Sequence, residues 1–199
     1  MSFVAQYLAE ASQVAARIDH AAVTRLVDLL AEARDSGGRL FVLGVGGSAG
    51  NASHAVNDFR KIAAFEAYAP TDNVSELTAR INDDGWDTSF ANWLKTSRLT
   101  SRDCLLVFSV GGGDVARKVS MNLVRALELA KEVGARIGAI VGRDGGFTAT
   151  VADACVLIPT VSPERVTAHA EAFQAVVWHM LVAHPRLQAA PMRWESLAR

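Results

Sequence analysis

The chain has 199 residues, half of them hydrophobic, and a formal net charge of −1 at pH 7. This length and apolar content suit one compact domain with a substantial core. The even balance of acidic and basic residues argues against a surface that binds nucleic acid or an anionic membrane, so we expect a small-molecule ligand instead.

The cysteines are few and lie in apolar surroundings. Cys104 and Cys155 each fall within a strand-like run, which predicts buried, reduced thiols rather than a disulfide or a metal clip. The N-terminus lacks the pattern of a signal peptide, and no apolar run reaches the length of a membrane span. We therefore expect a cytoplasmic protein without a membrane partner.

The first third of the chain predicts helices around one strand. Apolar residues recur at helical spacing from about Phe3 to Ala33, with a break near Asp19, and this predicts a pair of amphipathic helices. We expect residues 1–36 to form a helical hairpin at an oligomer interface. A strand over 39–43 and a helix over 48–64 follow.

The middle and last thirds repeat a theme of strand, turn and helix. Two short helices are expected on either side of a turn at 82–85, and a further turn contains Gly111, Gly112 and Gly113. The expected helices cover 75–81, 86–96, 115–133 and 164–182, and the expected strands cover 104–110, 136–141 and 154–158. This alternation predicts an α/β fold in which helices cover both faces of a mostly parallel sheet.

A glycine turn follows the first predicted strand. Gly46 and Gly47 let the backbone turn tightly, and the free N–H groups of the next helix, with the Ser48 hydroxyl, form a site that suits a phosphate. His54 and Asp58 are four residues apart in that helix and share one face. A metal-binding or acid–base pair is therefore expected one to two turns inside the helix.

The order of these motifs resembles the sugar isomerase (SIS) domain family, and within it the sedoheptulose 7-phosphate isomerase group. The resemblance spans nearly the whole chain and rests on the segments 44–48, 53–59, 82–85, 109–113, 142–146 and 171–179. It implies a single SIS domain over 1–199, a three-layer sandwich of flavodoxin-like topology, and a homotetramer with active sites at subunit boundaries.

The resemblance also implies a metal site and a reaction. A divalent metal, commonly zinc, would be held by His54, Asp58, Glu171 and His179, which are all possible zinc ligands. Asp58 stands where the family has a glutamate that acts as the base, and His179 stands where it has the partner acid or base. The expected reaction moves a carbonyl between C1 and C2 of a seven-carbon sugar phosphate through an enediol. The residues expected to bind substrate are Gly46, Gly47, Ser48, Asp83, Ser109, Gly111, Gly112, Gly113 and Glu171.

Alternatives remain open at the phosphate end of the site. The family's second loop is rich in Ser and Thr, whereas this chain has Val110, three glycines and Asp114 after Ser109. Asp114 would either meet the phosphate or cap the following helix. A different phosphorylated or activated sugar, or a non-catalytic role as a sugar-phosphate-binding regulator, would also fit. His54 and His179 could equally be ordinary surface and core-edge residues, and His169 is expected at the surface.

Overall fold

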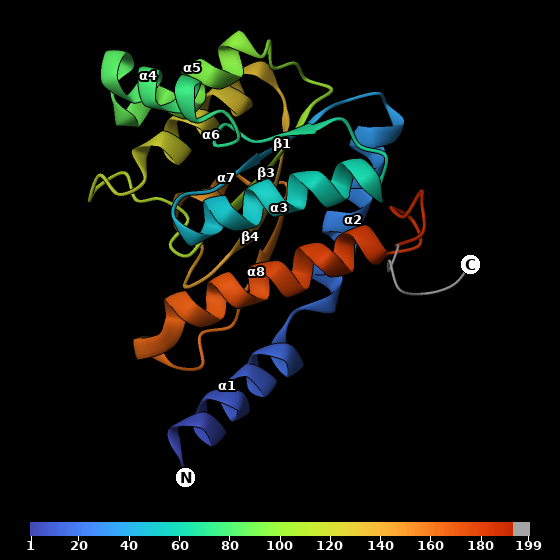
Figure 1. Cartoon of the computed structure of the whole chain (residues 1–199), viewed down its shortest axis with the longest axis vertical. Helices are drawn as coiled ribbons and strands as arrows, with labels where there is room; N and C mark the ends of the chain where they lie inside the picture. The colour runs from blue at the N-terminus through green and yellow to red at the C-terminus, as the bar shows by residue number, and fades with distance from the viewer. Residues whose placement is uncertain (193–199) are drawn as a thin grey trace.

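A parallel β-sheet forms the middle layer of the molecule (Figure 1). The computed structural model describes residues 1–192, and within them the sheet has five strands in the order β2-β1-β3-β4-β5, every neighbouring pair parallel. The strands are β1 (Leu40–Leu43), β2 (Ala67–Tyr68), β3 (Cys104–Ser109), β4 (Arg136–Val141) and β5 (Ala154–Leu157). The sequence predicted four of these, and β2 was missed because two residues are too few to show a pattern.

Helices cover both faces of the sheet, which confirms the predicted sandwich. Side chains alternate along each strand, so Leu40 and Val42 join one core while Phe41 and Leu43 join the other. The first core lies under α2 (His20–Asp35), α3 (Gly47–Lys61) and α8 (Val166–Ala183). The second lies under α4 (Val74–Asp84), α5 (Ser89–Thr96), α6 (Met121–Val133) and α7 (Gly146–Val151). Short 3-10 turns precede α5 (Trp86–Thr88) and α8 (Pro163–Arg165).

Helix α1 (Phe3–Arg17) leads away from the body of the molecule instead of folding back along α2 (Figure 1). The break between them lies where it was predicted, because the Asp19 carboxylate accepts the first N–H groups of α2. Glu10 ties α1 to the start of α8, accepting hydrogen bonds from Arg165 and lying 3.0 Å from His169 Nε2. Arg165, and then His169, lower the pKa of Glu10 to about 2. The expectation that His169 is a surface residue is therefore wrong, since this ion cluster buries it.

Two predicted boundaries need correction, and one helix was not predicted. Helix α6 begins at Met121 and not near residue 115, because the backbones of Asp114 and Val119 pair as an antiparallel bridge and Ser120 has a left-handed φ of 51°. Helix α4 continues through the expected turn as far as Asp84, and only Gly85, with φ of 81°, departs from it. Helix α7 was not predicted, because its six residues lack a helical apolar pattern.

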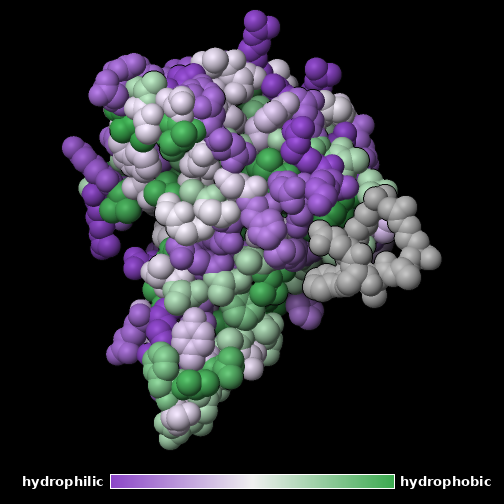
Figure 2. Space-filling view, in the orientation of Figure 1, coloured by the Kyte–Doolittle hydropathy of each residue, from purple (hydrophilic) through white to green (hydrophobic). Residues whose placement is uncertain are grey.

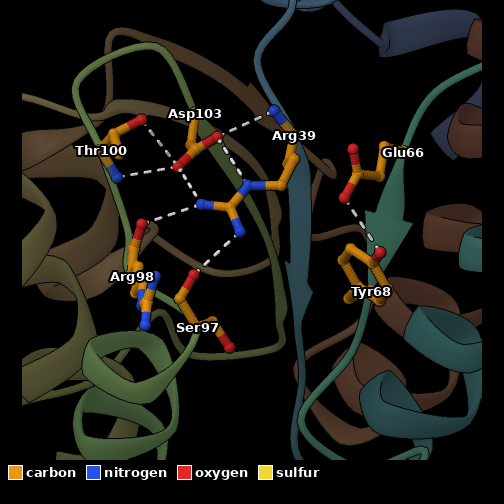
Figure 3. Close-up of polar contacts among 7 residues, drawn as sticks. All are labelled: Arg39, Glu66, Tyr68, Ser97, Arg98, Thr100 and Asp103. Carbon is orange, nitrogen blue, oxygen red and sulfur yellow. Dashed lines mark hydrogen bonds and ion pairs between the residues drawn. The ribbon is translucent and has the colours of Figure 1, made fainter.

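An ion pair between Arg39 and Asp103 joins the amino ends of β1 and β3, at the end of the sheet opposite the glycine turns (Figure 3). The buried Asp103 carboxylate accepts hydrogen bonds from the backbone and guanidinium of Arg39 and from the backbone and hydroxyl of Thr100. Burial alone would raise the pKa of Asp103, but the hydrogen bonds from Arg39 and Thr100 outweigh it and lower that pKa. Nearby, the Tyr68 hydroxyl donates to Glu66. This cluster is structural, because it lies at the end of the sheet away from the ligand-binding edge.

Among the described residues no helix is both long and apolar enough to cross a membrane.

Candidate functional site

Helices α3 and α8 lie side by side on one face of the sheet and run in the same direction (Figure 1). Near their starts, the Asn51 side chain donates to the Glu171 carbonyl and to Gln174 Oε1. One to two turns later, the rings of His54 and Trp178 are in contact, with centroids 4.7 Å apart. The two helices thus stay in contact over successive turns, and the side chains between them meet along one line of contact.

Three of the predicted site residues meet on this face. His54 Nε2 and His179 Nε2 each lie 3.9 Å from Asp58 Oδ2, and one ligand atom from each residue lies within 4.8 Å of the others. The two imidazole rings are perpendicular, with centroids 5.5 Å apart. His54 and Asp58 come from successive turns of α3 and His179 from α8, so the cluster depends on the packing of the two helices.

Neighbouring groups orient the donor atoms of this cluster. His179 Nδ1 lies 2.7 Å from the Ala175 carbonyl, which can only accept, so Nδ1 carries the hydrogen and Nε2 keeps a free lone pair. The Asn57 side chain donates to Asp58 Oδ1, which leaves Oδ2 directed at the imidazoles. The buried Trp178 ring stacks on His179 at 3.5 Å between centroids and thereby fixes that ring. Neighbouring groups therefore orient two of the three donor atoms, His179 Nε2 and Asp58 Oδ2.

The geometry of these three donors fits a divalent metal. A tetrahedral zinc with ligands at about 2.0–2.2 Å needs donor atoms about 3.4 Å apart. The two 3.9 Å separations exceed that value by about half an ångström. Small side-chain rotations close such a gap. Two imidazoles and one carboxylate also match the donor set of a catalytic zinc site with one position left for substrate.

Glu171 lies outside this cluster. Its carboxylate rests against Gly47 at the start of α3, so that a Cβ at Gly47 would collide with the carboxylate oxygens. A negative charge is stabilised there by the N-terminal end of the helix dipole. The first glycine turn, Gly46–Gly47–Ser48, therefore already faces an anionic side chain, and Gly47 is required by close approach.

The second glycine turn is held by hydrogen bonds within the protein. Gly112 N–H donates to the Ser109 hydroxyl, and its carbonyl accepts from both the N–H and the hydroxyl of Thr148. A Cβ at Gly112 would collide with the Gly145 carbonyl, which explains the glycine. The expectation that these glycines open directly into a helix is wrong, since α6 starts only after Ser120. Gly111 and Gly113 line a pocket beside the turn.

Two acidic residues take other places than the sequence suggested. Asp114 accepts a hydrogen bond from the Arg117 N–H and so caps the turn before Val119, and not helix α6. Asp83 lies in the last turn of α4, on the face of the sheet opposite α3 and α8 (Figure 1). Within one chain Asp83 does not meet the cluster, and a contribution to a neighbouring subunit stays a prediction.

The sequence reasoning missed the supporting residues of the site. Asn51 lies three residues before His54 on α3, whereas Gln174 lies five residues before His179 on α8 and Trp178 is next to it. Spacing therefore gave a signal for Asn51 alone, and a buried amide or indole is usual in any core, so the sequence could not single out the other two.

Comparison with known proteins gives consistent results. The SIS domain model matches residues 6–142. The lincomycin biosynthesis protein LmbN of Streptomyces lincolnensis is 31% identical over 92% of this chain and 69% of its own length. Phosphoheptose isomerases of Chlorobium phaeobacteroides and Citrifermentans bemidjiense are each 33% identical, over 77% and 73% of this chain and 68% and 74% of their own.

The solved structures agree in fold. Phosphoheptose isomerase GmhA from Neisseria gonorrhoeae superposes with a TM-score of 0.78 at 26% identity, covering 90% of this chain and 95% of that one. The enzyme from Francisella tularensis gives 0.79 at 22% identity, covering 92% and 97%. The likeness therefore covers at least nine-tenths of this chain.

Proposed function

The chain belongs to the SIS domain family, within its phosphoheptose isomerase group, and from this membership we propose that it interconverts the ketose and aldose forms of a phosphorylated sugar. The substrate we propose is sedoheptulose 7-phosphate. The observation that carries the proposal is the convergence of His54, Asp58 and His179, two imidazoles and a carboxylate, on one point between α3 and α8. Proton transfer and carbonyl polarisation both need such groups.

The distance between the cluster and the glycine turn supports a long substrate. His54 follows Gly47 by seven residues of α3, which corresponds to about 10.5 Å along the helix. An extended seven-carbon chain can place its carbonyl at the cluster and its phosphate at or beyond the glycine turn. A three-carbon sugar phosphate is too short for both contacts.

We propose that His54, Asp58 and His179 hold a divalent metal, with zinc favoured by the donor set. When bound, the metal would polarise the substrate carbonyl and stabilise negative charge on oxygen. Glu171 was expected among the ligands, but its place beside Gly47 suits contact with sugar hydroxyls better. A carboxylate in that place accepts hydrogen bonds from hydroxyl groups of the carbon chain.

The reaction requires two proton movements, and the chain has groups for each. In the ketose-to-aldose direction we assign to the Asp58 carboxylate the removal of a proton from C1 and its return to C2. His179 Nε2 would move a proton between the two oxygens, because Nδ1 is held by the Ala175 carbonyl. Asp58 Oδ2 and His179 Nε2 cannot bind a metal and carry a proton at the same moment, so each atom acts in catalysis either as a metal ligand or as a proton carrier. If they act as metal ligands, the isomerisation rate should depend on bound metal. If they act as proton carriers, the metal-free protein should keep its activity.

A second candidate is an isomerase for a different phosphorylated or activated sugar. It is favoured by the second glycine turn, in which the Ser109 hydroxyl and the Gly112 N–H are bonded to each other. A phosphate could gain the Gly112 N–H only by breaking this bond, which leaves the Ser109 O–H as the one side-chain hydroxyl of the turn. A non-catalytic role is less well supported, because a binding protein has no need of two oriented imidazoles and a carboxylate.

We propose that the protein acts as a homo-oligomer, with a homotetramer expected. Apolar side chains gather over α1 in the lower part of Figure 2, where Phe3, Val4 and Leu8 are 67%, 65% and 61% exposed. A groove of about 310 Å³ beside it is lined by Ile18, Phe173 and other apolar residues. A helix that projects with an apolar face is stabilised by packing on another chain. A cytoplasmic location remains a prediction from the reduced cysteines.

The proposal is tested by measuring metal content and proton exchange together. Purified protein is analysed for metals, and sedoheptulose 7-phosphate is followed by NMR in deuterated water. We expect near-stoichiometric zinc and deuterium next to the carbonyl. His179→Ala should abolish exchange, while Arg125→Ala, on the exposed face of α6, should not. Exchange at the wild-type rate in His179→Ala would remove that residue from the mechanism, and absence of exchange in the wild type would favour the second candidate.

A further inference from the structure

A pocket of about 820 Å³ lies beside the second glycine turn, at the carboxyl ends of three successive strands. Its walls come from the segment 111–119 after β3, from 143–150 after β4, and from 160–166 after β5. The first of these segments projects at the left of the molecule in Figure 1. Ligands of open α/β sheets bind at this edge, and the volume lies within the usual range for small ligands of about 300–1,000 Å³.

The charged side chains that line the pocket differ in whether they have a hydrogen-bond or ion-pair partner. Asp114 accepts a hydrogen bond from the Arg117 N–H, and its other oxygen lies 3.6 Å from the Arg117 guanidinium. Asp144 accepts from the Gly146 N–H. Within residues 1–192, Arg143 has neither a hydrogen bond nor an ion pair, although it lines the same pocket. One guanidinium is therefore available to an anionic ligand.

The backbone of Arg143 is unfavourable for an arginine. Its φ is 52°, in the left-handed region that residues with a Cβ rarely adopt. Glycine would take this conformation without strain, and Gly142, Gly145 and Gly146 surround the position. A strained residue kept with a free charge points to a role for its side chain.

Neither glycine turn offers a cation for the phosphate of a sugar phosphate. The first turn faces the Glu171 carboxylate, which would repel a phosphate at close range. The second turn has its Gly112 N–H bonded to Ser109. The pocket adjoins the second turn, because Gly111 and Gly113 line it. Val166, on another wall of the pocket, lies five residues before Glu171 on α8, which corresponds to about 7.5 Å along the helix.

We propose that this pocket holds the phosphate of the substrate and that Arg143 is the residue that pairs with it. The inference rests on the proposed function, since it takes the ligand to be a sugar phosphate. The guanidinium can donate two parallel hydrogen bonds to phosphate oxygens, a geometry that lysine lacks. Arg143 thus replaces the hydroxyl groups that the second loop does not supply, and it selects phosphorylated over neutral sugars.

Calorimetric titration of the full chain with sedoheptulose 7-phosphate, inorganic phosphate and unphosphorylated sedoheptulose tests the assignment. Arg143→Gln should weaken both phosphate probes at least tenfold, leave the neutral sugar unchanged, and leave the metal content unchanged. Arg143→Lys should restore only part of the affinity. The matched control is Arg125→Gln on α6, an exposed arginine paired with Glu128 outside the pocket, which should bind like the wild type.

A measurement of Tm distinguishes a variant that has lost phosphate binding from one that has simply unfolded. Arg143→Gly relieves the left-handed backbone, so its Tm should equal or exceed that of the wild type while phosphate affinity falls as in Arg143→Gln. In the isomerase assay both variants should raise KM with little change in kcat. Wild-type phosphate affinity in both variants, or no phosphate binding by the wild type, would overturn the assignment. Phosphate binding through Arg143 without isomerase activity would instead reject only the proposed reaction.

Discussion

Replacing Asp58 by asparagine tests the metal site most directly. The change keeps the shape of the side chain but removes its charge and makes one terminal atom a donor instead of an acceptor. In the structure Asp58 Oδ2 is equally distant, 3.9 Å, from the Nε2 atoms of His54 and His179. It is therefore the shared corner of the cluster, and its loss affects the contacts of both imidazoles.

The expected magnitude follows from this geometry. Loss of an outer-shell partner of a metal ligand costs about 10–100-fold in affinity, so loss of the ligand itself should cost at least about 100-fold, or about 2.8 kcal/mol. His54→Gln removes one of the three donors without touching the Asp58–His179 edge. We expect its effect to be smaller than that of Asp58→Asn.

Zinc affinity is measured by competition with a coloured chelator, and folding is checked by thermal denaturation of the apo-protein. The control is Asp87→Asn, which removes a carboxylate from the short turn before α5 on the opposite face of the sheet. If Asp58→Asn bound zinc as tightly as the wild type and Asp87→Asn, the three-residue site would be refuted.

Three further predictions concern stability, reactivity and assembly. Asp103→Ala should lower the free energy of unfolding by about 3–5 kcal/mol in urea titrations, because Arg39 loses its buried partner. The pKa of Asp103 is lowered in the fold, so its contribution is present above the unfolded pKa and lost as pH falls through the folded one; Asp103→Asn should flatten this acid limb. Burial raises the pKa of Cys104 to about 12, so alkylation at pH 8 should require unfolding, and appreciable labelling of the native protein would contradict the buried thiol. Leu8→Asp on α1 should shift the protein to smaller species in sedimentation experiments, whereas an unchanged assembly would place the interface elsewhere.

Local patterns in the sequence were enough for most of the fold. Apolar periodicity identified α2, α3, α8 and most of the strands, because burial of one face imposes the spacing of residues along a helix or strand. The same rule placed His54 and Asp58 on one helix face. The alternation of strands and helices predicted the parallel sheet. Strand β2, with two residues, is too short to show such a pattern, and the six residues of α7 lack a helical one.

The candidate site depends on distances between segments far apart in the chain, and the sequence could only suggest which residues take part. Resemblance grouped Glu171 with His54, Asp58 and His179, yet the packing of α8 on α3 brings three of them together and places Glu171 against Gly47.

The second glycine turn shows the same limit. Its glycines indicated a phosphate site, but the contacts of Gly112 with Ser109 and Thr148 engage its N–H and carbonyl groups. Nothing in the local sequence pattern singled out Arg143, and the pocket that it lines is what points to a role for its side chain. The sequence by itself determined which residues form helices and strands and which faces they bury, since those are short-range properties. Which polar groups meet, and which are left for a ligand, was decided by the tertiary structure, because side-chain contacts across the sheet edge depend on how the strands and helices pack.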